Sequence, residues 1–236
     1  MNGKVVLVTG AAKRIGRSIA LALAAEGAQV AIHYGSSEAE ARATAKECNN
    51  APIFQANMEK VPEIRAMVDR VAQHFGRIDA LVNNAARFTR FEPLDIEEKD
   101  WDYIHSVNLK SVFFCAQAAA KVMLKAEGGH IVNISSLGAL KPWEDHAHYC
   151  SSKAGVVMLT KCLAKAWSPK IAVNTVAPGV IPFDKVDARI ERFIAATPAK
   201  RAGTGEEIAE AVLFFLKSTN FITGQLIAVD GGLSLK

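Results

Sequence analysis

Val5-Val6-Leu7-Val8-Thr9-Gly10-Ala11-Ala12-Lys13-Arg14-Ile15-Gly16 sets the architecture of this chain. The run Val5–Val8 is apolar and rich in β-branched residues, which predicts a strand buried on both faces of a sheet. A glycine-bearing turn follows directly, and an amphipathic, alanine-rich stretch starts inside it. Glycines let the backbone approach a phosphate, and the helix N-terminus supplies free N–H groups. The spacing G-x-G-x-x-G is absent, so this turn alone leaves nucleotide binding and a purely structural turn both open.

The same alternation of strand and helix recurs along the chain. Further buried strands are predicted at 29–32, 52–55, 80–82, 130–134, 171–176 and 226–229. Amphipathic helices are predicted at 15–26, 38–48, 62–75, 101–125, 149–167 and 205–215. This order favours a Rossmann-type, doubly wound parallel sheet of about seven strands in a three-layer α/β/α arrangement. Because no linker or low-complexity tract interrupts the 236 residues, we expect residues 1–236 to form a single domain.

Composition narrows the classes of partner. The formal net charge is +4 and the Lys and Arg residues are scattered, so we expect a small-molecule substrate and no nucleic acid. No apolar stretch reaches the roughly 18 residues that span a bilayer, so no membrane association is expected. The cysteines have neither CxxC nor metal-ligand spacing, which predicts reduced thiols, a cytoplasmic location and no bound metal. They are Cys48, Cys115, Cys150 and Cys162.

Tyr149 and Lys153 are four residues apart, and Ser136 precedes the tyrosine by thirteen positions. On a helix, residues i and i+4 share a face, so an ammonium can lie beside a phenol. A nearby cation lowers the pKa of a phenol from about 10 by roughly one to three units, toward the range useful for acid and base catalysis. Such pairs are also common on solvated helices, so the spacing alone does not separate the two interpretations.

In their order and spacing, these motifs resemble the short-chain dehydrogenase/reductase family over nearly the whole chain. Thr9-Gly10 and Ile15-Gly16 match the opening T-G-x-x-x-G-x-G motif of that family. Asn83-Asn84-Ala85-Ala86 resembles its N-N-A-G motif. The matches continue with the helix asparagine Asn108, with Pro178-Gly179 after the sixth predicted strand and with Asp230-Gly231-Gly232.

The resemblance implies a catalytic set of Ser136, Tyr149, Lys153 and Asn108. In that mechanism a nicotinamide delivers hydride to a carbonyl carbon while Tyr149 protonates the oxygen, which Ser136 holds by a hydrogen bond. Lys153 would contact the nicotinamide ribose and lower the pKa of the tyrosine, and Asn108 would position a water. Ser135 is either a supporting hydroxyl or a strand-end turn residue.

Two departures from the family pattern bear on the cofactor. Arg14 stands where the family has its middle glycine, and the second predicted strand ends without the acid that would bind both ribose hydroxyls. The cation of Arg14 and the hydroxyl donors of Ser36 and Ser37 suit a 2′-phosphate on the adenosine ribose, so we predict NADP(H) rather than NAD(H). The alternative is that Arg14 is a solvated helix-start residue and Ser36 caps the next helix. The predicted cofactor-binding residues are Gly10, Lys13, Arg14, Ile15, Gly16, His33, Tyr34, Ser36, Ser37, Asn57, Met58, Asn84, Ala85, Ala86, Tyr149, Lys153, Pro178, Gly179 and Ile181. For Asn57, a hydrogen bond to adenine and a cap of the following helix stay equally open.

The substrate is less determined. The opening motif, His33-Tyr34 and Phe88 also resemble pteridine reductases, in which the matching aromatic stacks on a pterin. That group has an aspartate where this chain has Ser136, so we favour reduction of a ketone or aldehyde of the 3-oxoacyl or general type, with dihydropterin reduction as the alternative. A non-catalytic dinucleotide-binding sensor or scaffold is a third interpretation. Candidate substrate contacts are Ser136, Phe88, His146 and His148, although Phe88 could be a simple apolar wall and residues 143–148 a solvated loop.

Two larger features complete the expectation from the family. Residues 180–187 are expected to cover the substrate as a lid that becomes ordered when cofactor binds. The alanine-rich stretches 101–125 and 149–167 are expected to pair between subunits, as in the homotetramers of the family.

Overall fold

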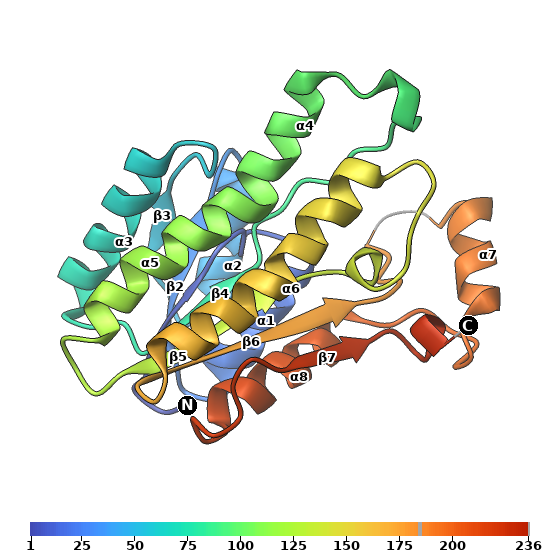
Figure 1. The fold of residues 1–236 in the computed structure, drawn as a ribbon. Helices are drawn as coiled ribbons and strands as arrows, with labels where there is room; N and C mark the ends of the chain where they lie inside the picture. Colours follow the sequence, from blue (N-terminus) through green and yellow to red (C-terminus); the bar gives the residue numbers. More distant parts are fainter. Residues whose placement is uncertain (184–185, 236) are drawn as a thin grey trace.

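Seven parallel strands form one sheet in the computed structural model, which describes residues 1–183 and 186–235. The strand order is β3-β2-β1-β4-β5-β6-β7, so the predicted doubly wound sheet is confirmed (Figure 1). The strands are β1 Val5–Val8, β2 Gln29–Tyr34, β3 Ile53–Gln55, β4 Ala80–Asn83, β5 Gly129–Ile134, β6 Ile171–Pro178 and β7 Leu226–Val229. The α-helices are α1 Arg14–Ala25, α2 Glu38–Glu47, α3 Val61–Phe75, α4 Glu98–His105, α5 Ser111–Met123, α6 Ala147–Trp167, α7 Ala188–Ala196 and α8 Gly205–Lys217.

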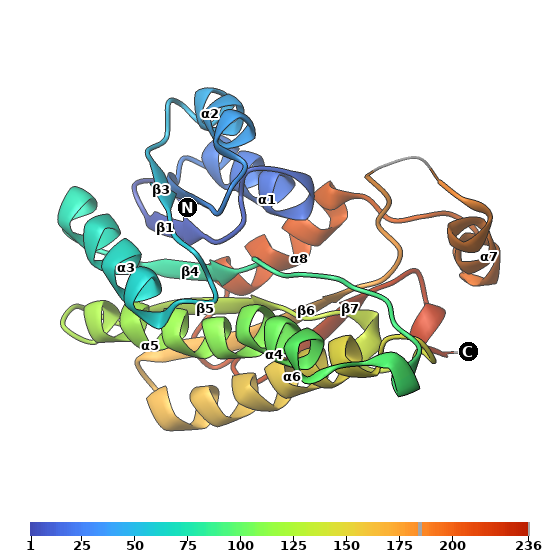
Figure 2. The ribbon, with the colours of Figure 1, turned by 90° about the horizontal axis from the view of Figure 1, so that it is seen from above.

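Helices cover both faces of the sheet, as the three-layer prediction requires. The side chains of α1, α2 and α8 pack with one face of the strands, and those of α3, α5 and α6 pack with the other. Figure 2 shows these two helical layers on opposite sides of the sheet. Because both faces are buried, the strands are almost wholly apolar, and Leu7, Ile32, Leu81 and Ile131 have no exposed surface.

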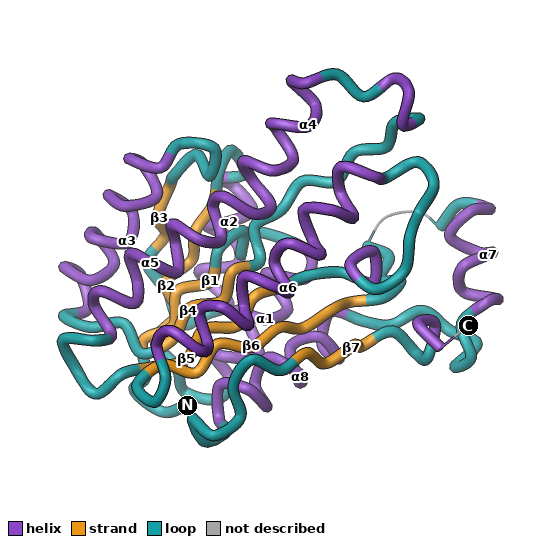
Figure 3. Tube along the Cα trace, viewed as in Figure 1, coloured by secondary structure: helices purple, strands orange, loops and turns teal. Residues whose placement is uncertain are grey.

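The strand order reverses between β1 and β4. The chain leaves β1 to build β2 and β3 on one side, and later returns to build β4 to β7 on the other. The loops after β1 and β4 therefore diverge at the carboxyl edge of the sheet, where parallel α/β sheets bind their ligands. Figure 3 shows the strands in orange with these connecting loops in teal.

Three segments differ from the sequence prediction. The helix expected at 101–125 is interrupted, because Ser106–Lys110 forms a wide π-helical turn (η2) between α4 and α5. Helix α6 begins at Ala147, two residues before the predicted start. Helix α7 was not predicted; it is capped by the side chain of Asp187, which accepts hydrogen bonds from two backbone N–H groups. Residues 184–185 of the expected lid lie outside the described residues.

Candidate active site

A cleft of about 820 Å³ opens at the carboxyl edge of the sheet, within the size range of small-molecule sites. Sequence analysis identified most of the residues that line it: Gly10, Lys13, Arg14, Ile15, Gly16, His33, Tyr34, Ser36, Ser37, Asn57, Met58, Asn84, Ala85, Ala86, Phe88 and Ile181. Four further residues that were predicted to bind cofactor are not part of the lining: Tyr149, Lys153, Pro178 and Gly179. Sequence analysis missed Ala12, Gly35, Gln55, Ala56, Glu59, Glu63, Arg87, Val107 and Phe183. Ala12 lies at a variable position of the opening motif and Phe183 lies within the expected lid, whereas the other residues belong to no motif and line the cleft because of where the neighbouring strands and turns end.

Close backbone packing shapes the turn after β1. A Cβ atom on Gly16 would lie 2.2 Å from the carbonyl oxygen of Gly10, so α1 can begin so close to the turn only without a side chain there. The Asn84 side chain donates hydrogen bonds to the carbonyl oxygens of Thr9 and Gly10, at 2.9 and 3.1 Å. The turn is thus fixed from both sides, and the start of α1 lies at the cleft, where helix N–H groups favour an anion.

Arg14 occupies an unusual backbone conformation. Its φ is +56°, in the left-handed region that glycine adopts without cost and that other residues rarely adopt. Strained residues of this kind concentrate at functional sites, where a side chain compensates for the backbone cost. The position of the missing family glycine therefore keeps the glycine-like backbone and adds a guanidinium at the rim of the cleft.

His33 lines the cleft, but its ring bonds within the protein and does not offer the phosphate donor that was expected. The backbone N–H of Gly10 donates to Nδ1 at 3.0 Å, and Nε2 lies 3.1 Å from the carbonyl oxygen of Ala56. The ring is buried, and burial lowers its pKa to about 4. His33 is therefore neutral at pH 7, with its proton on Nε2, and it fixes the glycine turn by accepting a hydrogen bond.

The residues after β2 show which hydroxyls are used for capping. Ser37, not Ser36, is the N-cap of α2, so the alternative cap assigned to Ser36 is wrong. The Ser37 side chain makes no capping hydrogen bond, which leaves its hydroxyl available at the cleft. The Asn57 oxygen accepts a hydrogen bond from the Glu59 N–H at 2.9 Å and so closes a turn, whereas the N-cap of α3 is Lys60.

Ser136 and Tyr149 come together from different elements. Ser136 follows β5, Tyr149 lies in the first turn of α6, and both side chains are buried. The Ser136 Oγ atom accepts a hydrogen bond from the Gly138 N–H at 3.1 Å, so its own proton is directed elsewhere. Burial raises the pKa of Tyr149 to about 12, although a hydrogen bond with Ser136 acts in the opposite direction. The phenol therefore keeps its proton at neutral pH.

Lys153 lies one helical turn after Tyr149, as its spacing predicts, but its charge does not lower the pKa of the phenol. Its Nζ atom donates to the carbonyl oxygen of Ile134 at 2.9 Å and is 6.0 Å from the centre of the Tyr149 ring. Burial lowers the pKa of Lys153 to about 8. Because a backbone carbonyl receives the ammonium and both groups are desolvated, burial and not their mutual charge determines the pKa of each residue.

Asn108 and Ser135 hold in place the segments around Tyr149 and Lys153. Asn108 lies in the π-helical turn, and its side chain bonds both the N–H and the carbonyl of Arg87, at 2.8 and 2.9 Å. It thereby holds the loop after β4 at the cleft. Ser135 donates to the carbonyl oxygen of Lys153 at 2.9 Å, which ties the end of β5 to α6. The Ser135 hydroxyl thus supports the position of the lysine.

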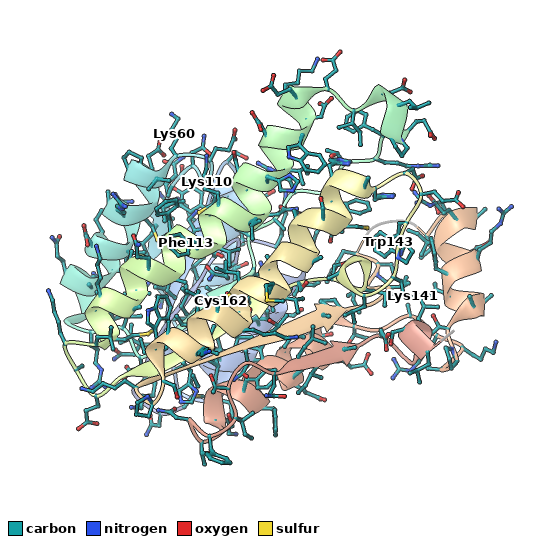
Figure 4. All side chains as sticks on the ribbon, in the orientation of Figure 1. Lys60, Lys110, Phe113, Lys141, Trp143 and Cys162 are labelled. Atoms are coloured by element: carbon teal, nitrogen blue, oxygen red, sulfur yellow. The ribbon has the colours of Figure 1, made fainter. Side chains whose placement is uncertain are left out.

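An aromatic wall, made of Phe88, Trp143 and His146, surrounds Tyr149. Phe88 is 58% exposed, stacks on His146 with ring centres 4.7 Å apart, and meets the Tyr149 ring edge-on at 4.8 Å. Trp143 lies parallel to the Tyr149 ring, with 6.0 Å between centres. Figure 4 labels Trp143 in the loop before α6. Because Phe88 lines the cleft, the buried tyrosine adjoins it. Trp143 was missed as an individual residue, since only its loop was singled out.

The two histidines predicted as substrate contacts have no exposed surface. Phe88 and Trp143 cover His146, and the Nε2 atom of His148 lies 2.7 Å from the Thr89 hydroxyl. In this arrangement of the described residues, neither ring can contact a substrate directly.

Within residues 1–183 and 186–235, no cluster of three or more His, Cys, Asp or Glu side chains has a geometry suited to a metal ion. No helix in the same part of the chain is long and apolar enough to cross a membrane.

These features define a class of protein. A doubly wound parallel sheet with a phosphate-binding turn, a cleft at the switch point and a buried serine–tyrosine–lysine group beside it is the arrangement of a dinucleotide-dependent oxidoreductase.

Comparison with known proteins specifies the family. The profile of the family described as enoyl-(acyl carrier protein) reductase matches residues 10–234. The 3-oxoacyl-[acyl-carrier-protein] reductase FabG of Staphylococcus aureus is 39% identical over 240 residues, which cover 98% of each chain. A putative short-chain alcohol dehydrogenase from Sinorhizobium meliloti superimposes with a TM-score of 0.93 at 34% identity, over 100% of this chain and 98% of that one. A blue fluorescent protein from a metagenomic library, solved in complex with NADPH, superimposes with a TM-score of 0.94 at 31% identity, over 98% of both chains. The chain belongs to the short-chain dehydrogenase/reductase family.

Proposed function

We propose that this protein reduces a carbonyl group to an alcohol with NADPH, and that its substrate is a 3-oxoacyl thioester. The observation that carries the proposal is the buried pair of Ser136 and Tyr149, with Lys153 one helical turn away and the cleft adjoining through Phe88. The relative from Staphylococcus aureus is named as a 3-oxoacyl reductase, and a structural neighbour binds NADPH. Both names support the choice of substrate and cofactor.

The residues of the chain fit the chemistry of a reduction. When bound, the nicotinamide supplies the hydride that adds to the carbonyl carbon. Tyr149 donates a proton to the carbonyl oxygen, and its raised pKa of about 12 keeps that proton in place at pH 7 until negative charge develops on the oxygen. Ser136 donates its free hydroxyl proton to the same oxygen. Lys153, with a pKa of about 8, remains mostly charged at pH 7, and its ammonium is assigned to the ribose of the nicotinamide.

Selectivity for NADPH is proposed to depend on the rim of the cleft. Arg14 lies after β1, and Ser37, whose hydroxyl makes no capping hydrogen bond, lies after β2. Residues 33–37 at the end of β2 include no carboxylate. A guanidinium with a hydroxyl donor binds a 2′-phosphate, whereas a carboxylate there would repel it. The remaining cleft residues that were predicted from the sequence are proposed to contact the rest of the dinucleotide.

The proposal is tested by the consumption of NADPH in the presence of a panel of substrates. The panel contains a 3-oxoacyl thioester, an enoyl thioester, a simple ketone, a quinone and a dihydropterin. We expect the 3-oxoacyl thioester to give the highest kcat/KM, and Tyr149→Phe, which keeps the ring but removes the proton, to reduce it by at least about a hundredfold. Faster turnover of the dihydropterin would establish the alternative activity. Tight NADPH binding without turnover of any compound would favour a binding module and contradict the proposal.

Assembly and location form a separate proposal. We propose a homotetramer in the cytoplasm. Met158 and Cys162 on α6 are exposed, as are Phe214 on α8 and Phe221 after it. Figure 4 labels Cys162 on α6 and Phe113 on α5. Exposed apolar patches of this kind mark contacts between proteins. The four thiols are free, which suits a reducing compartment. Light scattering that gives the mass of a monomer would contradict the assembly.

A further inference from the structure

Three segments converge on a single carboxylate beside the aromatic wall. Asp145 belongs to the loop before α6, Arg90 to the loop after β4, and Arg189 to the first turn of α7. The Arg90 Nε atom donates to Asp145 Oδ2, and Arg189 Nη2 donates to Asp145 Oδ1 at 3.2 Å. The side chain of Asp145 is only 19% exposed, although Arg90 and Arg189 are 61% and 38% exposed. Figure 1 shows α7 beside the loop that leads into α6.

The carboxylate lies next to the aromatic wall. Asp145 Oδ1 is 2.5 Å from His146 Nδ1, and the ring of His146 stacks on Phe88. Arg90 follows Phe88 by two residues, and the backbone N–H of Phe91 donates to the carbonyl oxygen of Asp145. The position of Phe88 over Tyr149 is therefore linked to the charged group of Asp145 from two directions, through its own loop and through His146.

None of these three charged residues touches the proton donor, and the proposed reduction does not use them. Their geometry nevertheless joins the segment that carries Phe88 to the helix that follows the expected lid. Opposite charges that connect separate loops across a cleft restrict how far those loops move apart, more strongly when the shared charge is partly buried.

We propose that Asp145 is a positioning residue, which holds the Phe88 loop and helix α7 together over the substrate and so determines how tightly the substrate binds. This inference rests on the proposed carbonyl reduction for its kinetic consequence. Its structural consequence is independent of any reaction: without the carboxylate, both neighbouring segments become more mobile while the fold remains intact.

Hydrogen exchange of the complete protein tests the structural consequence. In Asp145→Asn, which keeps the size and removes the charge, we expect the amides of residues 87–91 and 188–196 to exchange about fivefold faster, as befits the loss of a partly exposed ion pair. Arg189→Gln should accelerate exchange in α7 alone, and Arg90→Gln in 87–91 alone. Asp145→Glu, which retains the charge, should restore at least half of the lost protection.

Steady-state kinetics with the best carbonyl substrate test the functional consequence. We expect Asp145→Asn to raise KM about fivefold and to change kcat by less than twofold, because the proton donor and its partners are untouched. The matched control is Asp79→Asn. Asp79 also joins two cations, Arg77 and Lys4, but it precedes β4 at the opposite edge of the sheet. Its loss should lower stability without changing KM or the exchange of either segment.

Two results would overturn the inference. One is unchanged exchange in both segments of Asp145→Asn. The other is a large fall in kcat at constant KM, which would place Asp145 in the chemical step. Failure of the proposed function looks different: the wild-type protein would then turn over no carbonyl compound, while the exchange measurements would still decide whether Asp145 holds the two segments together.

Discussion

Protonation of His33 should destabilise the fold in a defined pH range. In the native structure its Nδ1 atom accepts the Gly10 N–H, so a proton on Nδ1 would face another N–H group. The pKa of the ring is lowered from 6.5 in the unfolded chain to about 4 in the native protein by burial. Because the native pKa is the lower one, the unfolded chain binds the proton more readily between these values. The resulting contribution to stability is complete above pH 6.5 and is lost as the pH falls toward 4.

The magnitude follows from the difference between the two pKa values. At about 1.4 kcal/mol per pKa unit, the full difference corresponds to about 3 kcal/mol, of which about 2 kcal/mol is lost between pH 7 and pH 4.5. Urea unfolding followed by circular dichroism at these two pH values measures the free energy of unfolding. His33→Gln retains an acceptor for Gly10 but does not titrate. We expect the wild-type protein to lose about 2 kcal/mol more than this variant over the interval.

In the comparison with His33→Gln, the contributions of the other titrating groups to the change in stability cancel. His130, His146 and His148 also have pKa values lowered by burial, so they contribute with the same sign in both proteins. If the two proteins lost the same free energy between pH 7 and pH 4.5, His33 would not be held in its neutral form, and the explanation of the glycine turn would be wrong.

Three substitutions test other parts of the cleft. Arg14→Gly should relieve the positive φ and leave stability unchanged or higher, while raising KM for NADPH at least tenfold relative to NADH, as expected for the loss of a charge-assisted bond; equal effects on both cofactors would contradict the role of the guanidinium. Gly16→Ala places a Cβ 2.2 Å from the Gly10 carbonyl oxygen, so NADPH affinity measured by fluorescence should fall at least tenfold; retained affinity would show that the turn tolerates displacement. Phe88→Ala should raise KM for the carbonyl substrate several-fold with little effect on NADPH binding, measured by initial rates, and an unchanged KM would remove Phe88 from the substrate surface.

Local patterns predicted the sheet well. Runs such as Val5–Val8 identify strands because a parallel sheet buries both of their faces, and no distant contact is needed to recognise them. Tyr149 and Lys153 share a helix, so their spacing in the sequence was enough to predict their relative positions. The effect of Lys153 on Tyr149 was not predictable in the same way, because it depends on the carbonyl of Ile134, which the fold brings to the ammonium.

Other features depend on contacts between distant parts of the chain. His33 suggested a phosphate donor from its place after the second strand, but the fold encloses its ring between Gly10 and Ala56. Helix α7 was not predicted although Ile190, Phe193 and Ile194 have helical spacing; it spans only nine residues and buries none of them fully. The bond between Asp145 and Arg189 joins residues 44 positions apart, and no motif in either segment indicates the other.

The wide turn at Ser106–Lys110 lets the helix accommodate one additional residue. A π-helical turn contains one residue more than an α-helical turn, and each residue of an α-helix rotates the chain by about 100°. Because the widened turn accommodates the additional residue, deletion of one residue here would join α4 and α5 into a regular helix with little change in their relative rotation, but would remove the turn that carries Asn108. Asn108 would then no longer face the backbone of Arg87, and the loop that carries Phe88 would lose its anchor. A single added residue thus places Asn108 where it holds the loop that borders the cleft.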